Sequence, residues 1–94
     1  EGAGGDPSAR GLELELTVLV SLERERGNVS YAALNELKNN PQILNVSYVT
    51  GEYGLIFTMV TQTMEDYEEF TRNVLYADRN VKNFKTLVRM RKIK

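Results

Sequence analysis

The sequence predicts a small α+β domain whose elements follow in the order β-α-β-β-α-β, and three patterns in its 94 residues support this. Residues 12–23 alternate apolar and polar side chains, which is the twofold period of a strand with one covered face. Residues 42–62 hold two apolar runs around a turn with two glycines, as a β-hairpin does. Residues 28–39 and 63–75 repeat apolar side chains at helical spacing.

The first strand is expected over residues 12–23, because the even-numbered apolar residues from Leu12 to Leu22 share one face. Leu19 is the apolar exception on the other face. We therefore expect the middle of that second face to be covered as well.

The first helix is expected to begin at Asn28, whose side chain can cap a free backbone N–H. The segment Asn39-Asn40-Pro41 ends it, because Asn tolerates a left-handed cap and proline disfavours helix in the residue before it. The apolar face of this helix is formed by Val29, Ala32, Ala33, Leu34 and Leu37.

The hairpin between Gln42 and Gln62 is rich in β-branched and aromatic residues, which favour an extended backbone. Gly51 and Gly54 are expected to supply the positive φ angles that a short chain reversal needs. Both runs carry apolar residues on both faces, so we expect this hairpin in the middle of the fold or inside an assembly.

The second helix is expected to start after Thr63, whose hydroxyl can accept from a free amide of the first turn. Its apolar stripe consists of Met64, Tyr67, Phe70, Val74 and Leu75. A loop over Ala77–Asn80 follows, and Val81–Ile93 alternates as the last strand.

With right-handed crossovers, this element order predicts a ferredoxin-like sandwich: an antiparallel sheet in the order 4-1-3-2 with both helices on one face. Residues 12–94 form this domain, and residues 1–11, which contain glycine and proline without periodicity, are expected to be a flexible leader or linker remnant. The sheet face that the helices leave uncovered also carries many apolar residues, so we expect dimerisation through it.

Composition narrows the class of function. The net charge of −1 gives the domain no overall attraction to DNA. No apolar run approaches the roughly 18 residues of a membrane helix, and no signal pattern is present. The chain has no cysteine and no histidine, the commonest general base and metal ligand at neutral pH. We expect no enzymatic activity, no catalytic residue, no metal, no cofactor and a cytoplasmic location.

Two charged clusters have plain structural explanations. Six of the twelve basic residues fall within Lys82–Lys94, where Arg89 and Arg91 would lie near Glu13 and Glu15 of the first strand, and Lys82 and Lys85 near Glu23 and Glu25. Cross-strand pairing or solvation is favoured over phosphate binding. The acids of residues 65–69 point in different directions around a helix, which favours solvation over a cation site.

Taken together in register, several segments resemble the effector-binding and assembly (RAM) domain of Lrp/AsnC transcription regulators over about residues 16–94. The segments are Val18-Leu19-Val20 with Leu22-Glu23, Asn40-Pro41-Gln42-Ile43 at a helix end, Val46–Tyr53, the helix Tyr67–Leu75, and the last strand from Val81 through Thr86 to Lys94. The Thr-Gly turn at this place in the element order is the most specific of them.

The resemblance implies a homodimer, octamers or other rings of dimers, and a small effector, typically an amino acid, in the cleft between dimers. The ligand-binding residues that it implies are Thr50, Gly51, Glu52, Tyr53 and Gly54 in the turn, with Thr86 of the last strand facing the same site. The family commonly has Asp at the place of Gly54, where it can pair with an ammonium group. Here Glu52 is the carboxylate available to substitute.

Family regulators carry a helix-turn-helix domain, for which residues before Leu12 leave no room, so we expect DNA contact to belong to a separate domain. Two other interpretations stay open. A hydrophobic cavity with an isolated buried carboxylate would favour a small dimeric α+β-barrel enzyme such as a cofactor-poor monooxygenase. Edge-to-edge sheet pairing would favour a regulatory module similar to the ACT domain.

Overall fold

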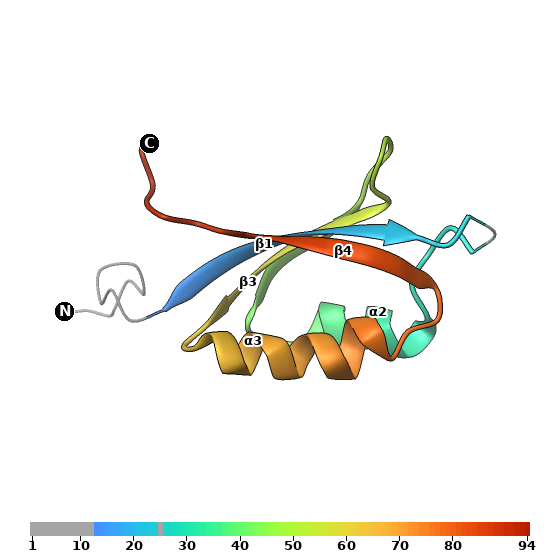
Figure 1. Ribbon diagram of the computed structural model, residues 1–94, viewed down its shortest axis with the longest axis horizontal. Coiled ribbons are helices and arrows are strands. Elements are labelled where there is room, and N and C mark those ends of the chain that lie inside the picture. Colours follow the sequence, from blue (N-terminus) through green and yellow to red (C-terminus); the bar gives the residue numbers. More distant parts are fainter. Residues whose placement is uncertain (1–12, 25) are drawn as a thin grey trace.

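The computed structural model describes residues 13–24 and 26–94, which form one four-stranded sheet with helices on one side (Figure 1). The elements in chain order are β1 (Leu14–Leu22), α2 (Tyr31–Asn39), β2 (Ile43–Tyr48), β3 (Leu55–Thr61), α3 (Met64–Phe70), the π-helical continuation η1 (Thr71–Tyr76) and β4 (Val81–Val88). The expected leader, residues 1–11, together with Leu12 and Glu25, lies outside the described residues.

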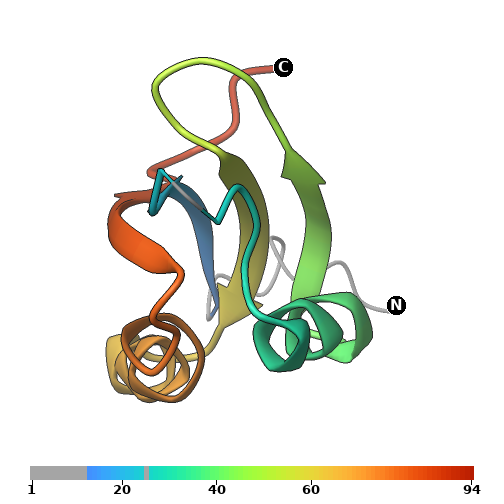
Figure 2. The ribbon, with the colours of Figure 1, turned by 90° about the vertical axis from the view of Figure 1, so that its right-hand side faces the viewer.

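The strands lie in the order β2-β3-β1-β4, and every neighbouring pair is antiparallel, so the expected 4-1-3-2 sheet is confirmed. On β1, Val18 lies opposite Phe57 of β3 on one side and Thr86 of β4 on the other. Figure 2 shows both helices beneath the same face of this sheet. We call the other face, which no described element covers, the open face.

The core lies between the sheet and the helices, and alternation along the strands determines which residues enter it. On β1 the buried positions are Leu16, Val18 and Val20, and on β3 they are Leu55, Phe57 and Met59. The helical layer contributes Ala33, Leu37, Tyr67, Val74 and Leu75, with Val29 from the loop before α2. Met64, which was expected in the apolar stripe of the second helix, is 40% exposed because it begins the helix beyond the edge of the core.

The helix starts were predicted with mixed success. Thr63 caps α3 as expected, accepting from the backbone N–H of Asp66. The expected cap Asn28 is wrong: Ser30 caps α2, and its Oγ accepts from Ala33 N at 3.2 Å. Both residue types cap well, so propensity alone does not choose between them.

The end of α2 at Asn39 is as predicted, and of the two expected causes only the proline applies. Asn40 has φ −77° and ψ 118°, an extended conformation rather than a left-handed one. Pro41 follows it, and the residue before a proline is pushed towards extended backbone. The proline therefore ends this helix.

The last strand is shorter than predicted, since β4 ends at Val88 and not at Ile93. A strand needs the backbone of a neighbour, and β1 begins at Leu14. The last contact of this ladder is the hydrogen bond from Arg89 N to Glu15 O at 2.9 Å. The exposed residues beyond it rise from the sheet on the side opposite the helices (Figure 1).

Candidate functional site

A groove of about 680 Å³ lies at one end of the sheet, between the β2–β3 turn and the start of β4. Three segments form its walls. The first is the end of β1 and the loop after it, with Ser21, Leu22, Glu23, Arg24 and Gly27. The second is the end of β2 and the turn, with Tyr48, Val49, Thr50, Gly51, Glu52, Tyr53 and Gly54, and the third is β4, with Lys82, Asn83 and Lys85. The turn rises from the sheet on the open-face side (Figure 1). All five turn residues proposed from the sequence therefore meet in one groove.

Two backbone hydrogen bonds fix the turn. Val49 N donates to Gly54 O, and Gly54 N donates to Val20 O of β1, each at 2.9 Å. Among the described residues, the backbone N–H groups of residues 50–53 have no hydrogen-bond acceptor. They are donors that a ligand in the groove can use.

The two glycines of the turn serve different purposes. Gly51 has φ +120°, which L side chains rarely adopt, and open space surrounds the place of its Cβ. Gly54 was also expected at positive φ, and this was wrong. A Cβ at Gly54 would lie 2.8 Å from Cδ1 of Leu22, so any other residue there would require the Leu22 side chain to move.

The β4 wall of the groove is polar and basic. Asn83 lies opposite Ser21 and Lys85 lies opposite Leu19 of β1, which puts both side chains on the open face. Lys82 and Arg24 complete a set of three cations, against the two carboxylates Glu23 and Glu52. The groove thus has an excess of positive charge, although the whole chain carries −1.

A chain of hydrogen bonds ties the groove to the helical layer. The Tyr48 hydroxyl, at the end of β2, accepts from Val29 N at 3.2 Å. The next residue, Ser30, donates its N–H to Asp78 Oδ2 at 2.9 Å, and Asp78 Oδ1 accepts from Asn80 N at 3.0 Å. Because Asn80 O in turn accepts from Glu23 N at 2.8 Å, the loop after η1 holds the end of β1 beside the groove.

Asp78 is the residue of this arrangement that the sequence did not reveal. It is buried, at 5% exposure. Its bond to Asn80 has a local signal, since Asp commonly accepts from the amide two residues on. Its bond to Ser30 spans 48 positions of the chain and has none.

Thr86, which was expected to face the same site as the turn, does not line this groove. It lies opposite the buried Val18, on the helix-covered face, and its hydroxyl is hydrogen-bonded to the Tyr67 hydroxyl. Burial raises the pKa of Tyr67. The hydrogen bond to Thr86 lowers this pKa, and the electrostatic interaction with Tyr76 raises it further. The alternation of β4 puts Thr86 and the groove residue Lys85 on opposite faces.

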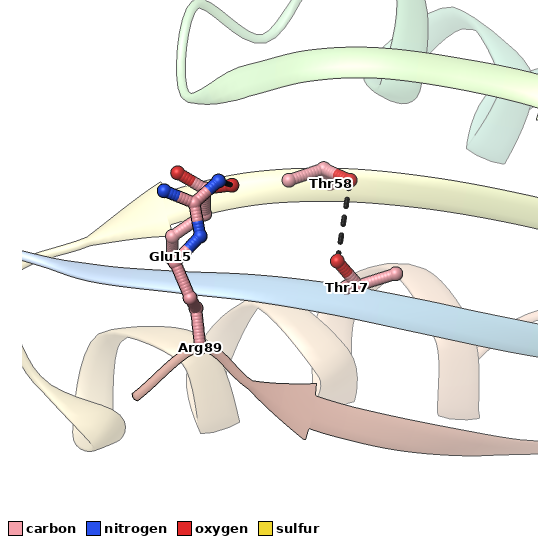
Figure 3. A network of polar contacts seen from close by, with 4 residues as sticks. All are labelled: Glu15, Thr17, Thr58 and Arg89. Atoms are coloured by element: carbon pink, nitrogen blue, oxygen red, sulfur yellow. Dashed lines mark hydrogen bonds and ion pairs between the residues drawn. The ribbon is translucent and has the colours of Figure 1, made fainter. Parts of the chain in front are cut away.

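The open face carries a mixed surface. Arg89 pairs with Glu15 as expected, and the Thr17 and Thr58 hydroxyls lie 3.4 Å apart across β1 and β3 (Figure 3). Apolar positions between and beside these are Leu19, Ile56, Val60 and Leu87. At the other end of β4, Lys82 and Lys85 line the same groove as Glu23 but form no salt bridge with a described carboxylate, which is the solvated alternative. Glu25, the other expected neighbour, lies outside the described residues.

Several chemistries find no support in residues 13–24 and 26–94. No group of three or more His, Cys, Asp or Glu could hold a metal ion there. No helix in this part of the chain is long and apolar enough to cross a membrane. The buried carboxylate of Asp78 accepts from two backbone amides, so it is not the isolated acid that a monooxygenase-like site would favour.

These features define a small α+β domain with a polar groove beside an uncovered sheet face. The profile of the family described as Lrp/AsnC ligand binding domain matches residues 15–94. An uncharacterized HTH-type transcriptional regulator of Sinorhizobium fredii is 38% identical over 88 residues, covering 94% of this chain and 52% of that protein. Another, from Haemophilus influenzae, is 23% identical over 81 residues, covering 86% and 48%.

Solved structures share the fold. AsnC of E. coli superposes with a TM-score of 0.74 at 14% identity, over 98% of this chain and 60% of that one. A transcriptional regulator of Neisseria meningitidis, in complex with L-Met, superposes with a TM-score of 0.73 at 18% identity, over 100% and 60%. The chain belongs to the Lrp/AsnC ligand-binding domain family, as its resemblance implied, and it spans about half the length of the curated relatives it matches.

Proposed function

We propose that this domain senses a small effector, an amino acid or a similar molecule, and transmits its presence to the assembly of an HTH-type transcription regulator. The observation that carries the proposal is the groove, whose lining combines residues 50–53, with backbone N–H groups that have no acceptor among the described residues, and the basic start of β4. Such amides bind carboxylates directly. The complex of the Neisseria regulator with L-Met supports an amino-acid-like effector.

The proposal assigns ligand contacts to Thr50, Gly51, Glu52, Tyr53 and Gly54, and no catalysis to any residue. The relatives are named as regulators, and the groove holds no nucleophile–base pair. Any contact with DNA would belong to a separate domain. The domain would act in the cytoplasm, where such regulators meet their metabolites.

Self-association through the open face is the second part of the proposal. Leu87 on this face is 54% exposed, and Leu19, Ile56 and Val60 lie near it on the same surface. A sheet-to-sheet homodimer would bury these side chains. Octamers or other rings of dimers would follow from further contacts. An effector bound beside this face can shift such an equilibrium only by binding the assembled and dissociated states differently.

A thermal-shift screen against the common amino acids at millimolar concentration tests the effector. Ligand at 100 times its Kd stabilises a protein by about 2.7 kcal/mol, which moves Tm measurably. A selective shift, absent in Gly51→Val, supports the proposal. Failure of every small molecule to change Tm or the sedimentation profile contradicts it.

Sedimentation velocity tests the interface. Leu87→Glu introduces a charge on the open face, and Met64→Glu is the matched control, because Met64 is an exposed residue of the helical layer. We expect Leu87→Glu to weaken dimerisation at least about tenfold, with the control unchanged. Equal effects of both variants, or a monomeric parent protein, would contradict dimerisation through this face.

A further inference from the structure

We infer that the groove selects a small dicarboxylate, with one acid group on the turn and the other on β4. The inference rests on the proposed function, because it names the chemical class of the effector for the same groove. The shared chemistry is two carboxylates on a short carbon chain. The source is either an acidic amino acid or a dicarboxylic acid without an amino group.

The groove has two separate places for an anion. The first is the turn, whose amides at residues 50–53 have no acceptor among the described residues. Gly51 has no side chain, and open space around its Cβ position lets a ligand approach the backbone closely. The second is the start of β4, where Lys82 and Lys85 line the same groove and form no salt bridge with a described carboxylate.

The charges of the lining favour a ligand with a net negative charge. Arg24, Lys82 and Lys85 outnumber Glu23 and Glu52. The excess is one positive charge. A monocarboxylic amino acid is a neutral zwitterion and leaves it unbalanced, whereas an acidic amino acid, with its net charge of −1, balances it. A dicarboxylic acid without an amino group is attracted to the same cations and leaves one negative charge over. Charge-assisted hydrogen bonds are roughly twice as strong as neutral ones, so the second carboxylate should be recognised strongly.

The same lining limits the binding of an ammonium group. Position 54 is a glycine and carries no side chain, so Glu52 is the only carboxylate of the turn. Uncharged polar groups, the Ser21 hydroxyl and the Asn83 amide, lie opposite each other between the cations. An ammonium group is therefore tolerated near Glu52 or Glu23 and is not required.

Isothermal titration calorimetry on this chain, at constant ionic strength, tests the inference with matched pairs of compounds. The pairs are glutamate with glutamine, aspartate with asparagine, and 2-oxoglutarate and succinate with their monoacid counterparts. We expect each diacid to bind at least about tenfold more tightly than its partner. Comparison of glutamate with 2-oxoglutarate then identifies the source.

Variants make the test specific to β4. Lys82→Met and Lys85→Met each keep the length of an exposed side chain and remove its charge. Lys38→Met changes an exposed residue of α2 outside the groove and is the control. We expect the preference for diacids to fall about tenfold in both groove variants and to persist in the control.

The outcomes separate this inference from the proposed function. If glutamine, asparagine or neutral amino acids bind as tightly as the diacids, or if the lysine variants keep the preference, the dicarboxylate inference is wrong while effector sensing stands. If no compound of either class binds, the dicarboxylate inference is wrong, and the thermal-shift screen of the common amino acids decides the proposed function separately.

Discussion

Removing the carboxylate of Asp78 is the perturbation whose cost the structure defines most fully. The buried side chain accepts from Ser30 N at 2.9 Å and from Asn80 N at 3.0 Å, and Asp78→Ala leaves both amides without an acceptor. A hydrogen bond to a charged group contributes about 1.5–3 kcal/mol. We therefore expect the free energy of unfolding to fall by roughly 3–5 kcal/mol. At about 4–8 °C per kcal/mol for a domain of this size, Tm should fall by more than about 12 °C.

Urea denaturation at a fixed protein concentration measures this cost, because self-association would otherwise change the apparent stability. Arg79→Ala is the matched control, an exposed side chain in the same loop, and we expect it to change stability by less than about 0.5 kcal/mol. Asp78→Asn retains one acceptor and should fall between the two, which covers the case in which the alanine variant does not fold. Equal stabilities of Asp78→Ala and Arg79→Ala would refute the reasoning.

Three further predictions concern single side chains. Gly51→Val forces a β-branched residue to φ +120° and should lower the free energy of unfolding, measured by urea denaturation, by about 1–3 kcal/mol. Glu52→Ala in the same turn should change it by less than about 0.5 kcal/mol. Equal losses in the two variants would contradict the role of the backbone angle. Tyr48→Phe removes the hydroxyl that accepts from the loop before α2 and should cost about 1 kcal/mol by the same assay. The pKa of Tyr67 is raised in the folded state, so its contribution to stability is complete below the unfolded pKa of about 10 and is lost as pH rises through the folded value. Stability measured between about pH 9 and 11 should therefore fall more steeply in the parent protein than in Tyr67→Phe, and parallel curves would rule this out.

Two of the predictions that failed depended on space or partners that are distant in sequence, whereas the others depended on local choices. Gly54 was expected to serve the turn by its φ angle, but its φ is not positive, and a Cβ there would crowd the Leu22 side chain of β1. The last strand was expected to reach Ile93, but the start of β1 limits how far it can pair. Thr86 was expected at the ligand site, and the pleat of β4 turns it to the other face.

The sequence by itself determined the secondary-structure elements, their order and the sheet topology that follows from that order. The twofold alternation of β1, the Thr63 cap and the glycine-containing turn are local signals, and the handedness of crossovers converts the element order into one topology. The family was also indicated by the sequence, because several short segments matched the pattern of Lrp/AsnC domains at the expected places in the element order. Tertiary structure decided the groove, because its walls come from three segments that are brought together only when the strands pair into the sheet. It also decided the role of Asp78, whose partner Ser30 lies 48 residues away: a buried carboxylate must find donors wherever the fold places them, and no local pattern records where that is.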